Sequence, residues 1–305
     1  MSVPVAYLGI ILIWATTPLA IQWSSQGAGY AFAVLARMLI GVLIAALVIA
    51  FWRIPFPLHA RARRAYLVGG LGLFGGMALT YWGARYIHSG LVSVIFGLSP
   101  LLAGVFSAIF LGEHSLTRLR VLGLTLAIAG LSVIFLEGGS FGGEHALLGL
   151  AALLLAVCIY SGCLVWLKQI GDDSPPLATT LGTLTVSLPL FGLLWLGSGG
   201  LWPQDVPVRA LGAIVYLGVF GSVIGFALYY YVIRHLDTAR VALITLITPV
   251  LALLLGRFLN GETVALRLWL GTLMILAGLV LHQSEMLRSL LHYPPLRQPS
   301  REVDN

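Results

Sequence analysis

Charge is scarce in this chain. Only 9% of its 305 residues are Asp, Glu, Lys or Arg, whereas 59% are hydrophobic, and the mean hydropathy is +0.98. Ordinary water-soluble domains carry about 25% charged residues. The low charge content excludes such a domain, and we expect the chain to be embedded in a lipid bilayer.

Motifs for hydrolytic and metal chemistry are also missing. The sequence has no His-Glu-x-x-His and no Gly-x-Ser-x-Gly, and its seven histidines fall singly at predicted loops and helix ends. Its two cysteines, Cys158 and Cys163, lie inside one apolar stretch, where helix geometry does not allow a disulfide. We therefore expect no enzyme activity, no cofactor and no metal site.

Acidic residues are missing from the middle of the apolar stretches. All eleven Asp and Glu residues fall in predicted loops, in the tail or at helix ends. Ion-coupled carriers commonly place a carboxylate at bilayer depth, because its charge changes with occupancy in a low-dielectric site. The absence of such an acid favours facilitated diffusion over ion coupling.

Long apolar runs are what the sequence has in abundance. Runs of about 18 to 25 residues, bounded by charges or Gly/Pro clusters, predict about ten membrane-spanning helices and an all-α integral membrane fold. The expected spans are residues 3–24, 29–51, 66–86, 90–111, 117–136, 146–168, 176–197, 209–233, 238–259 and 265–284.

Basic residues predict the orientation and the partners. If the N-terminus is cytoplasmic, most Lys and Arg residues, including the cluster at 61–64, lie on the cytoplasmic side, as the positive-inside rule requires. The C-terminus is then cytoplasmic too. The formal net charge of +6 is explained by topology and by anionic lipid, so the expected partners are the bilayer and a small-molecule substrate, with no nucleic acid.

One stretch of the chain occurs twice. Residues 79–113 match residues 228–262 without a gap, and the shared positions in the first copy are Tyr81, Arg85, Val92, Pro100, Leu102, Ala103, Gly112 and Glu113. Five spans in each copy force the second copy to cross the membrane upside down. The sequence predicts two inverted five-helix repeats, residues 1–137 and 144–284, followed by a disordered cytoplasmic tail, residues 285–305. Such duplications commonly build a transport path between the copies.

These residues resemble EamA-type members of the drug/metabolite transporter superfamily. The resemblance covers residues 3–284. In the first copy it is carried by Trp14-Ala15-Thr16-Thr17-Pro18, Arg37, Arg85, Ser89-Gly90-Leu91-Val92, Pro100 and Gly112-Glu113; in the second copy, by Arg234, Thr238-Ala239, Pro249 and Gly261-Glu262. It implies a ten-helix inner-membrane carrier with a central cavity, of a kind that commonly exports amino acids or other small metabolites. The second copy has residues 158–162 where the first has Trp14 to Pro18, so pocket residues do not transfer by symmetry there.

Aromatic and hydroxyl side chains within the spans are the candidates for substrate binding. Aromatic faces suit the apolar side of an amphipathic solute, and hydroxyls suit its polar groups. The predicted substrate-binding residues are Trp14, Thr17, Tyr81, Trp82, Ser99, Tyr160, Tyr230 and Thr248. Tyr81 and Tyr230 rank highest because they occupy matching positions. The alternative for residues near helix ends is an aromatic belt at the membrane interface.

Three charged or titrating residues and two prolines complete the candidates. Arg37 lies well inside a span, so it either binds a substrate carboxylate, gates the path, or locks the fold by bonding backbone carbonyls. His88 and Asp237 occupy matching positions and are the candidate titrating pair. Pro100 and Pro249 also match and are expected hinges, with a role in packing as the alternative.

These observations predict an inner-membrane secondary transporter. It is expected to export small metabolites, above all amphipathic or aromatic amino acids, by alternating access and without ion coupling, as a monomer or weak dimer. The alternatives are a proton-coupled drug/metabolite transporter for another substrate class, a channel, or a non-transporting membrane assembly protein.

Overall fold

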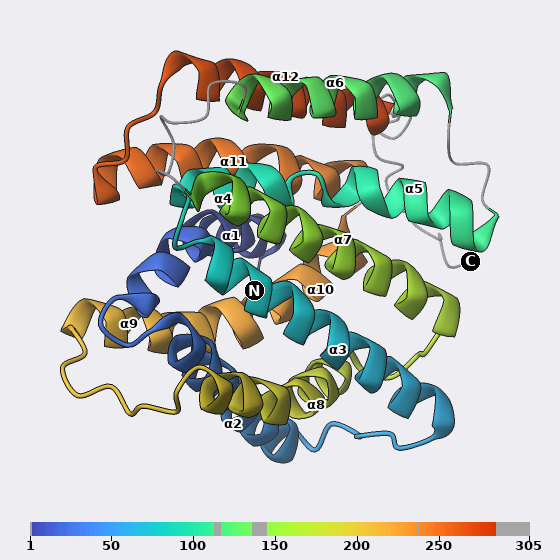
Figure 1. Cartoon of the computed structure of the whole chain (residues 1–305). Coiled ribbons are helices and arrows are strands. Elements are labelled where there is room, and N and C mark those ends of the chain that lie inside the picture. The colour runs from blue at the N-terminus through green and yellow to red at the C-terminus, as the bar shows by residue number, and fades with distance from the viewer. Residues whose placement is uncertain (1, 113–116, 136–144, 237, 285–305) are drawn as a thin grey trace, which may run out of the picture.

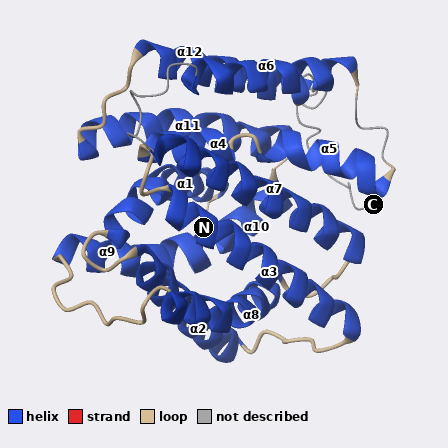
Figure 2. Ribbon diagram, viewed as in Figure 1, coloured by secondary structure: helices blue, strands red, loops and turns tan. Residues whose placement is uncertain are grey.

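The computed structural model describes residues 2–112, 117–135, 145–236 and 238–284. All regular secondary structure in these ranges is helical, which confirms the predicted fold class (Figure 2). The elements are α1 (Val3–Ser25), α2 (Tyr30–Trp52), α3 (Ala60–Gly83), α4 (Ser89–Phe96), α5 (Ser99–Leu111), α6 (Arg118–Phe135), α7 (Ala146–Ile170), α8 (Pro176–Gly197), α9 (Val208–Tyr216), the π-helix η2 (Leu217–Ile224), α10 (Gly225–His235), α11 (Thr238–Asn260) and α12 (Leu266–His282).

Most of these elements are long and apolar enough to cross a membrane. Within the described ranges, eight segments meet that criterion and α12 is a shorter apolar helix. The remaining helix, α3, is less apolar because Arg61, Arg63 and Arg64 occupy its opening turns. Counting α4 with α5 as the fourth span, and α9 with η2 and α10 as the eighth, gives the expected ten-helix membrane fold.

The third span begins earlier than the sequence predicts. Residue 66 is the expected start, but α3 begins at Ala60. The Nδ1 atom of His59 accepts a hydrogen bond from the Ala62 N–H at 3.2 Å and so caps the helix. Because Ala and Arg are also good helix formers, the basic cluster at 61–64, which precedes the expected span, is helical.

Helices distant in the sequence pair side by side (Figure 1). The pair α6 and α12 forms one edge of the molecule, α2 and α8 form the other, and α3 packs against α7 and α8. Glycine permits the close contact of α6 with α12, since a Cβ atom added at Gly130 would lie 2.8 Å from the Met274 Cβ. Membrane helices pack closely through such small residues because lipid tails are as apolar as leucine.

Large apolar side chains occur both inside and outside this bundle. Tyr81, Leu91 and Ile95 are fully buried in one hydrophobic cluster, whereas Leu47 and Phe51 are 68% and 84% exposed. Lipid makes both locations acceptable. Apolarity alone therefore does not identify the core of this chain.

The fourth span consists of two helices. The sequence predicts one helix over residues 90–111 with Pro100 inside it, but α4 ends at Phe96 and α5 begins at Ser99, so Pro100 lies in the first turn of α5. A proline ring clashes with the carbonyl four residues earlier, which here belongs to Phe96. The sequence predicts an interruption at Pro100, and the structure places it just before the proline, at residues 97–98.

The ninth span stays continuous through its own proline. Pro249 lies inside α11, which runs without a break from Thr238 to Asn260. A Cβ atom added at Gly97 would lie 3.6 Å from the Pro249 Cγ atom. The interruption of the fourth span therefore packs against the proline of the ninth.

The eighth span contains a π-helix that the sequence does not indicate. Residues Leu217–Ile224 form η2 between α9 and α10, and the Gly225 N–H donates to the Phe220 carbonyl five residues earlier. Single π turns inside α-helices are frequent at functional sites. This turn is the first structural marker of such a site in the chain.

Candidate functional site

Arg37 is buried against the π turn. Its side chain is 4% exposed, and its Nε donates a hydrogen bond to the Ser222 Oγ atom at 3.1 Å. Its Nη1 atom is buried and has no hydrogen-bond partner, and no carboxylate among the described residues forms an ion pair with it. The structure therefore gives this charge a neutral hydroxyl as partner, not an acid.

Glycines bring the π turn close to α2. A Cβ atom added at Gly218 would lie 2.6 Å from the Ile40 Cγ2 atom, and one added at Gly221 would lie 3.3 Å from the Arg37 Nη2 atom. Ser222 also donates to the Leu217 carbonyl at 3.0 Å, which fixes its hydroxyl oxygen toward Arg37. The small residues of η2 thus make room for the guanidinium.

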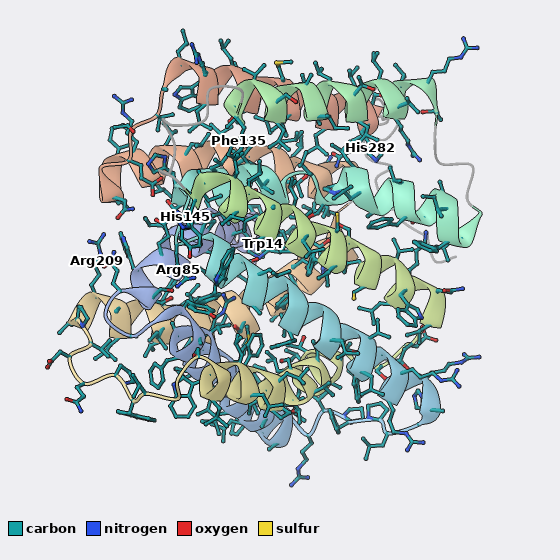
Figure 3. The ribbon with its side chains drawn as sticks, in the orientation of Figure 1. Trp14, Arg85, Phe135, His145, Arg209 and His282 are labelled. Atoms are coloured by element: carbon teal, nitrogen blue, oxygen red, sulfur yellow. The ribbon has the colours of Figure 1, made fainter. Side chains whose placement is uncertain are left out.

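Aromatic and hydroxyl groups of α1 lie beside the same span. The rings of Trp14 and Tyr229 have centroids 5.1 Å apart, and the Thr16 and Tyr216 hydroxyls are 2.6 Å apart. Trp14 is half-buried and lies near the centre of the view in Figure 3. Thr17 donates to the Ile13 carbonyl at 2.6 Å, so its hydroxyl is engaged within α1.

A second group of predicted residues surrounds the interruption of the fourth span. The Ser161 hydroxyl donates to the Ser99 carbonyl at 3.2 Å, and the Tyr160 ring centroid lies 6.4 Å from that of Phe96. Thr248 is 7% exposed and directly precedes Pro249, which faces Gly97. Ser99, Tyr160 and Thr248 therefore gather near one place.

The other predicted residues lie elsewhere. Tyr81 is fully buried in the hydrophobic cluster, and its hydroxyl has no hydrogen-bond partner within the part of the chain that the structure describes. Trp82 is near the end of α3, where its ring packs on Tyr86 with centroids 5.0 Å apart, as a membrane-interface residue would. His88 directly precedes α4. Two candidates, the Tyr230 side chain and Asp237, lie outside the described residues.

Glu262 is the functional candidate that the sequence reading missed. It was assigned to a loop, yet it is 8% exposed. Its Oε1 atom accepts hydrogen bonds from the Ser89 N–H at 3.0 Å and the Ser89 hydroxyl at 2.7 Å, and its Oε2 atom accepts one from the Gly90 N–H at 3.4 Å. A carboxylate from the second half of the chain thus caps the N-terminus of α4 in the first half, where free N–H groups and the helix dipole favour negative charge.

Further hydrogen bonds extend this contact. Asn260 donates to Glu262 at 2.9 Å and to Gln22 at 3.3 Å, and it accepts from the Trp23 indole at 3.0 Å. Gln22 in turn donates to the Ile87 carbonyl at 2.7 Å. We call the set Gln22, Trp23, Ser89, Asn260 and Glu262 the Glu262 network; it joins the ends of α1, α4 and α11.

The repeated Gly-Glu pair was the signal for this network. Gly261 has φ +65°, a conformation that favours glycine, and so turns the chain at the end of α11 to bring Glu262 back onto α4. The matching Glu113 lies outside the described residues. The sequence predicts only a loop or helix end for Glu262, because nothing local predicts a partner 173 positions away.

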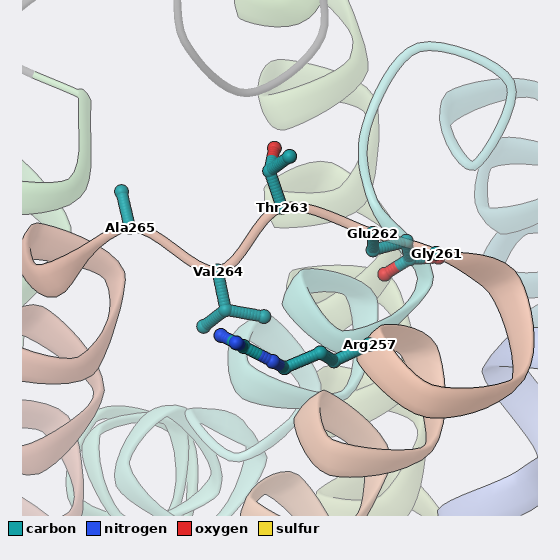
Figure 4. Close-up of a pocket in the computed structure, with 6 residues that line it drawn as sticks. All are labelled: Arg257, Gly261, Glu262, Thr263, Val264 and Ala265. Atoms are coloured by element: carbon teal, nitrogen blue, oxygen red, sulfur yellow. The ribbon is translucent and has the colours of Figure 1, made fainter.

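A groove lies on the turn between α11 and α12 (Figure 4). Its volume is about 430 Å³, and it is lined by Arg257, Gly261, Glu262, Thr263, Val264 and Ala265. None of the predicted substrate-binding residues lines it. The central cavity expected from the sequence stays a prediction, and the described part of the chain holds no cluster of three or more metal-ligating residues.

Comparison with known proteins identifies a family. The model of the EamA-like transporter family matches residues 2–136 and again residues 147–282. A solved crystal structure of 22% sequence identity superposes with a TM-score of 0.63, covering 95% of this chain and 98% of the other. That likeness supports the fold.

Two relatives are named as probable export proteins. A "probable terminal-alkyne amino-acid exporter" of Streptantibioticus cattleyicolor is 26% identical, covering 89% of this chain and 90% of the relative. A "probable amino-acid metabolite efflux pump" of Salmonella typhimurium is 25% identical, covering 77% and 82%. Several other relatives are named only as uncharacterized transporters.

Proposed function

Since the chain belongs to the EamA-like transporter family, we propose that this multi-pass membrane transporter exports small metabolites, above all amino acids, across the inner membrane. The names of two relatives support this substrate class. So do the Trp14–Tyr229 ring pair and the Thr16–Tyr216 hydroxyl pair, which suit an amphipathic solute. The proposal includes cytoplasmic termini, a monomer or weak dimer, and neither catalysis nor a cofactor.

The Glu262 network is the observation that carries the proposed mechanism. Alternating access needs a contact between the two halves that closes one end of the path and can be released. Glu262 makes such a contact, because its bonds to Ser89 and Gly90 all cross from one half to the other and part together if the halves rock. If both termini are cytoplasmic, the Glu262 network lies on the side of the membrane away from the cytoplasm and closes that end of the transport path.

Facilitated export is supported by where the acids lie. The described carboxylates are Asp172, Asp173, Asp205 and Glu262, and all four lie between helices. One observation favours the proton-coupled alternative. Glu262 is buried at a contact between the two halves, where it accepts hydrogen bonds from Ser89, the residue that directly follows His88. Protonation there would remove the charge that holds α4.

Counterflow in proteoliposomes tests the proposal. Vesicles that contain the purified full chain and are loaded with L-phenylalanine should take up external labelled L-phenylalanine faster than vesicles without internal L-phenylalanine. Internal substrate lets the carrier return to the outward-facing state with substrate bound, which speeds the next uptake step. A channel gives no such stimulation, and an assembly protein gives no uptake. Concentrative uptake driven by a pH gradient alone, and lost in Glu262→Gln, would replace facilitated export with proton coupling.

A further inference from the structure

Arg37 is a buried cation with an incomplete set of partners. One nitrogen bonds the neutral Ser222 hydroxyl, Nη1 has no hydrogen-bond partner among the described residues, and the residue is 4% exposed. A cation at membrane depth is costly unless an anion, water or backbone carbonyls surround it. A hydroxyl orients the guanidinium, but it does not balance the charge.

The Trp14 indole lies on the same face of the eighth span. A Cβ atom added at Gly221 would lie 3.3 Å from the Arg37 Nη2 atom, and one added at Gly225 would lie 3.7 Å from the Trp14 Nε1 atom. Gly221 lies in η2 and Gly225 directly follows it, and a separation of four residues is close to one turn of either an α- or a π-helix, so the two glycines face a similar side of the span. The face between them carries no side chain of its own, because both residues are glycine.

The indole N–H is a second donor without an acceptor. Among the described residues Trp14 makes a ring contact with Tyr229 and donates no hydrogen bond. An indole N–H can only donate, and a guanidinium has five N–H groups and no acceptor. The buried Arg37 Nη1 atom therefore lacks an acceptor among the described residues, and the half-buried Trp14 N–H beside this glycine face is a further donor.

We infer that Arg37 and Trp14 form the subsite for the carboxylate of the transported solute, over the Gly221–Gly225 face. This inference rests on the proposed function and names the part of the solute that the site recognises. Planar carboxylates match the guanidinium fork, and charge-assisted bonds of this kind are the stronger ones. The neighbouring Tyr229 ring receives the solute's aromatic or apolar side chain.

Paired solutes test the carboxylate requirement. Wild-type protein in proteoliposomes should exchange L-phenylalanine at least about tenfold faster than L-phenylalaninamide, which lacks the negative charge. Arg37→Gln should abolish that preference, and Arg37→Lys should keep part of it, because a point charge replaces the planar fork. An unchanged preference in well-folded Arg37→Gln would overturn the assignment.

A matched glycine pair covers the case in which Arg37 variants do not fold. Gly221→Ala places a methyl group against the Arg37 Nη2 atom, whereas Gly212→Ala, in the same span, meets no atom within 4 Å. We expect Gly221→Ala to slow L-phenylalanine exchange severalfold while Gly212→Ala leaves it unchanged. Equal exchange in the two variants contradicts the subsite.

Ligand-induced stabilisation separates the subsite from transport. Phenylacetate should raise the Tm of the detergent-solubilised full chain, phenethylamine should not, and Gly221→Ala should reduce the shift. A carboxylate-specific shift without counterflow would uphold the subsite and refute the transport proposal. Counterflow without any dependence on Arg37, Gly221 or the carboxylate would uphold transport and refute the subsite.

Discussion

Two equivalent faces of this molecule differ in charge. The register of the duplicated stretch, extended backwards, pairs Gly72 and Gly76 of α3 with Gly221 and Gly225 of the eighth span. Around the first pair, an added Cβ atom would lie 2.6 Å from the Cys163 Cβ and 3.9 Å from the Tyr160 Cβ. Around the second pair lie the Arg37 guanidinium and the Trp14 indole. Both faces have glycines and an aromatic residue, and only one has a cation.

The two halves also differ in backbone conformation. On the face with the cation, Gly221 lies in the π-helix η2 and Gly225 directly follows it, whereas α3 is a regular α-helix over the matching residues. The fourth span is interrupted before Pro100, whereas α11 continues through Pro249. Duplication has preserved where glycine and proline stand, while the side chains opposite them decide the local structure and the chemistry.

Copying the charge to the neutral face should have the largest effect. Cys163→Arg places a cation against Gly72, where no described acid forms an ion pair, so we expect a loss of about 3 kcal/mol in the free energy of unfolding. Cys163→Ala is the control, and it should change stability by less than about 1 kcal/mol. Unfolding midpoints in detergent measure both. Wild-type stability of Cys163→Arg would show that the two faces are equally able to hold a charge.

Removing the contact between halves should have the next largest effect. Glu262→Ala leaves the N–H groups of Ser89 and Gly90 without their acceptor, which should cost about 2 kcal/mol. Glu262→Gln keeps an acceptor and should cost less. The control is Thr263→Ala at the exposed neighbouring residue, and it should not measurably change the free energy of unfolding. If Glu262→Ala unfolds at the control's midpoint, the carboxylate does not hold the halves together.

Adding one methyl group to each glycine face should separate packing from function. At Gly72 the new Cβ would meet the Cys163 Cβ at 2.6 Å, so Gly72→Ala should destabilise the protein by about 1 to 2 kcal/mol. At Gly221 it would meet the end of a long side chain at 3.3 Å, and stability should fall by less than about 0.5 kcal/mol. If thermal unfolding shows that Gly72→Ala and Gly221→Ala lose the same stability, the two faces do not differ in how tightly they are packed.

Replacing the two prolines should have the smallest effect on stability. Pro100 starts α5, a position that tolerates proline, and Pro249 interrupts the hydrogen bonds of α11. Pro249→Ala should therefore leave stability equal or raise it by about 1 kcal/mol, while Pro100→Ala should mainly change the exchange rate by letting α4 and α5 join. Initial rates and unfolding midpoints of both variants decide this. The hinge role of Pro100 is refuted if its exchange rate is unchanged.

The membrane fold could be predicted from the sequence because length and hydropathy are properties of each segment alone. The extended start of α3 was missed because three arginines lower its hydropathy without disfavouring a helix. Pro100 predicts that the fourth span is interrupted, but it does not predict that the interruption lies before the proline, at residues 97–98. The π turn has no periodic signature, and its glycines are common in any membrane helix.

The candidate site was less accessible to sequence reasoning. Arg37 and Trp14 were recognised as polar groups inside spans, but that they face the same glycines depends on how α1 and α2 pack on the eighth span. Tyr81 was ranked highly for its matching position, yet the structure buries it in the apolar cluster. Glu262 was missed because its partners lie in the other half of the chain.

The bonds of Glu262 also bear on how the protein is made. Chains are synthesised and inserted from the N-terminus, so Ser89 and Gly90 have left the ribosome long before Glu262 does. The second half therefore emerges with a carboxylate whose hydrogen-bond donors, at Ser89 and Gly90, already exist, whereas synthesised alone it would have to leave that charge to water or lipid. Biogenesis is expected to be directional: the first half serves as the template on which the end of α11 completes its insertion.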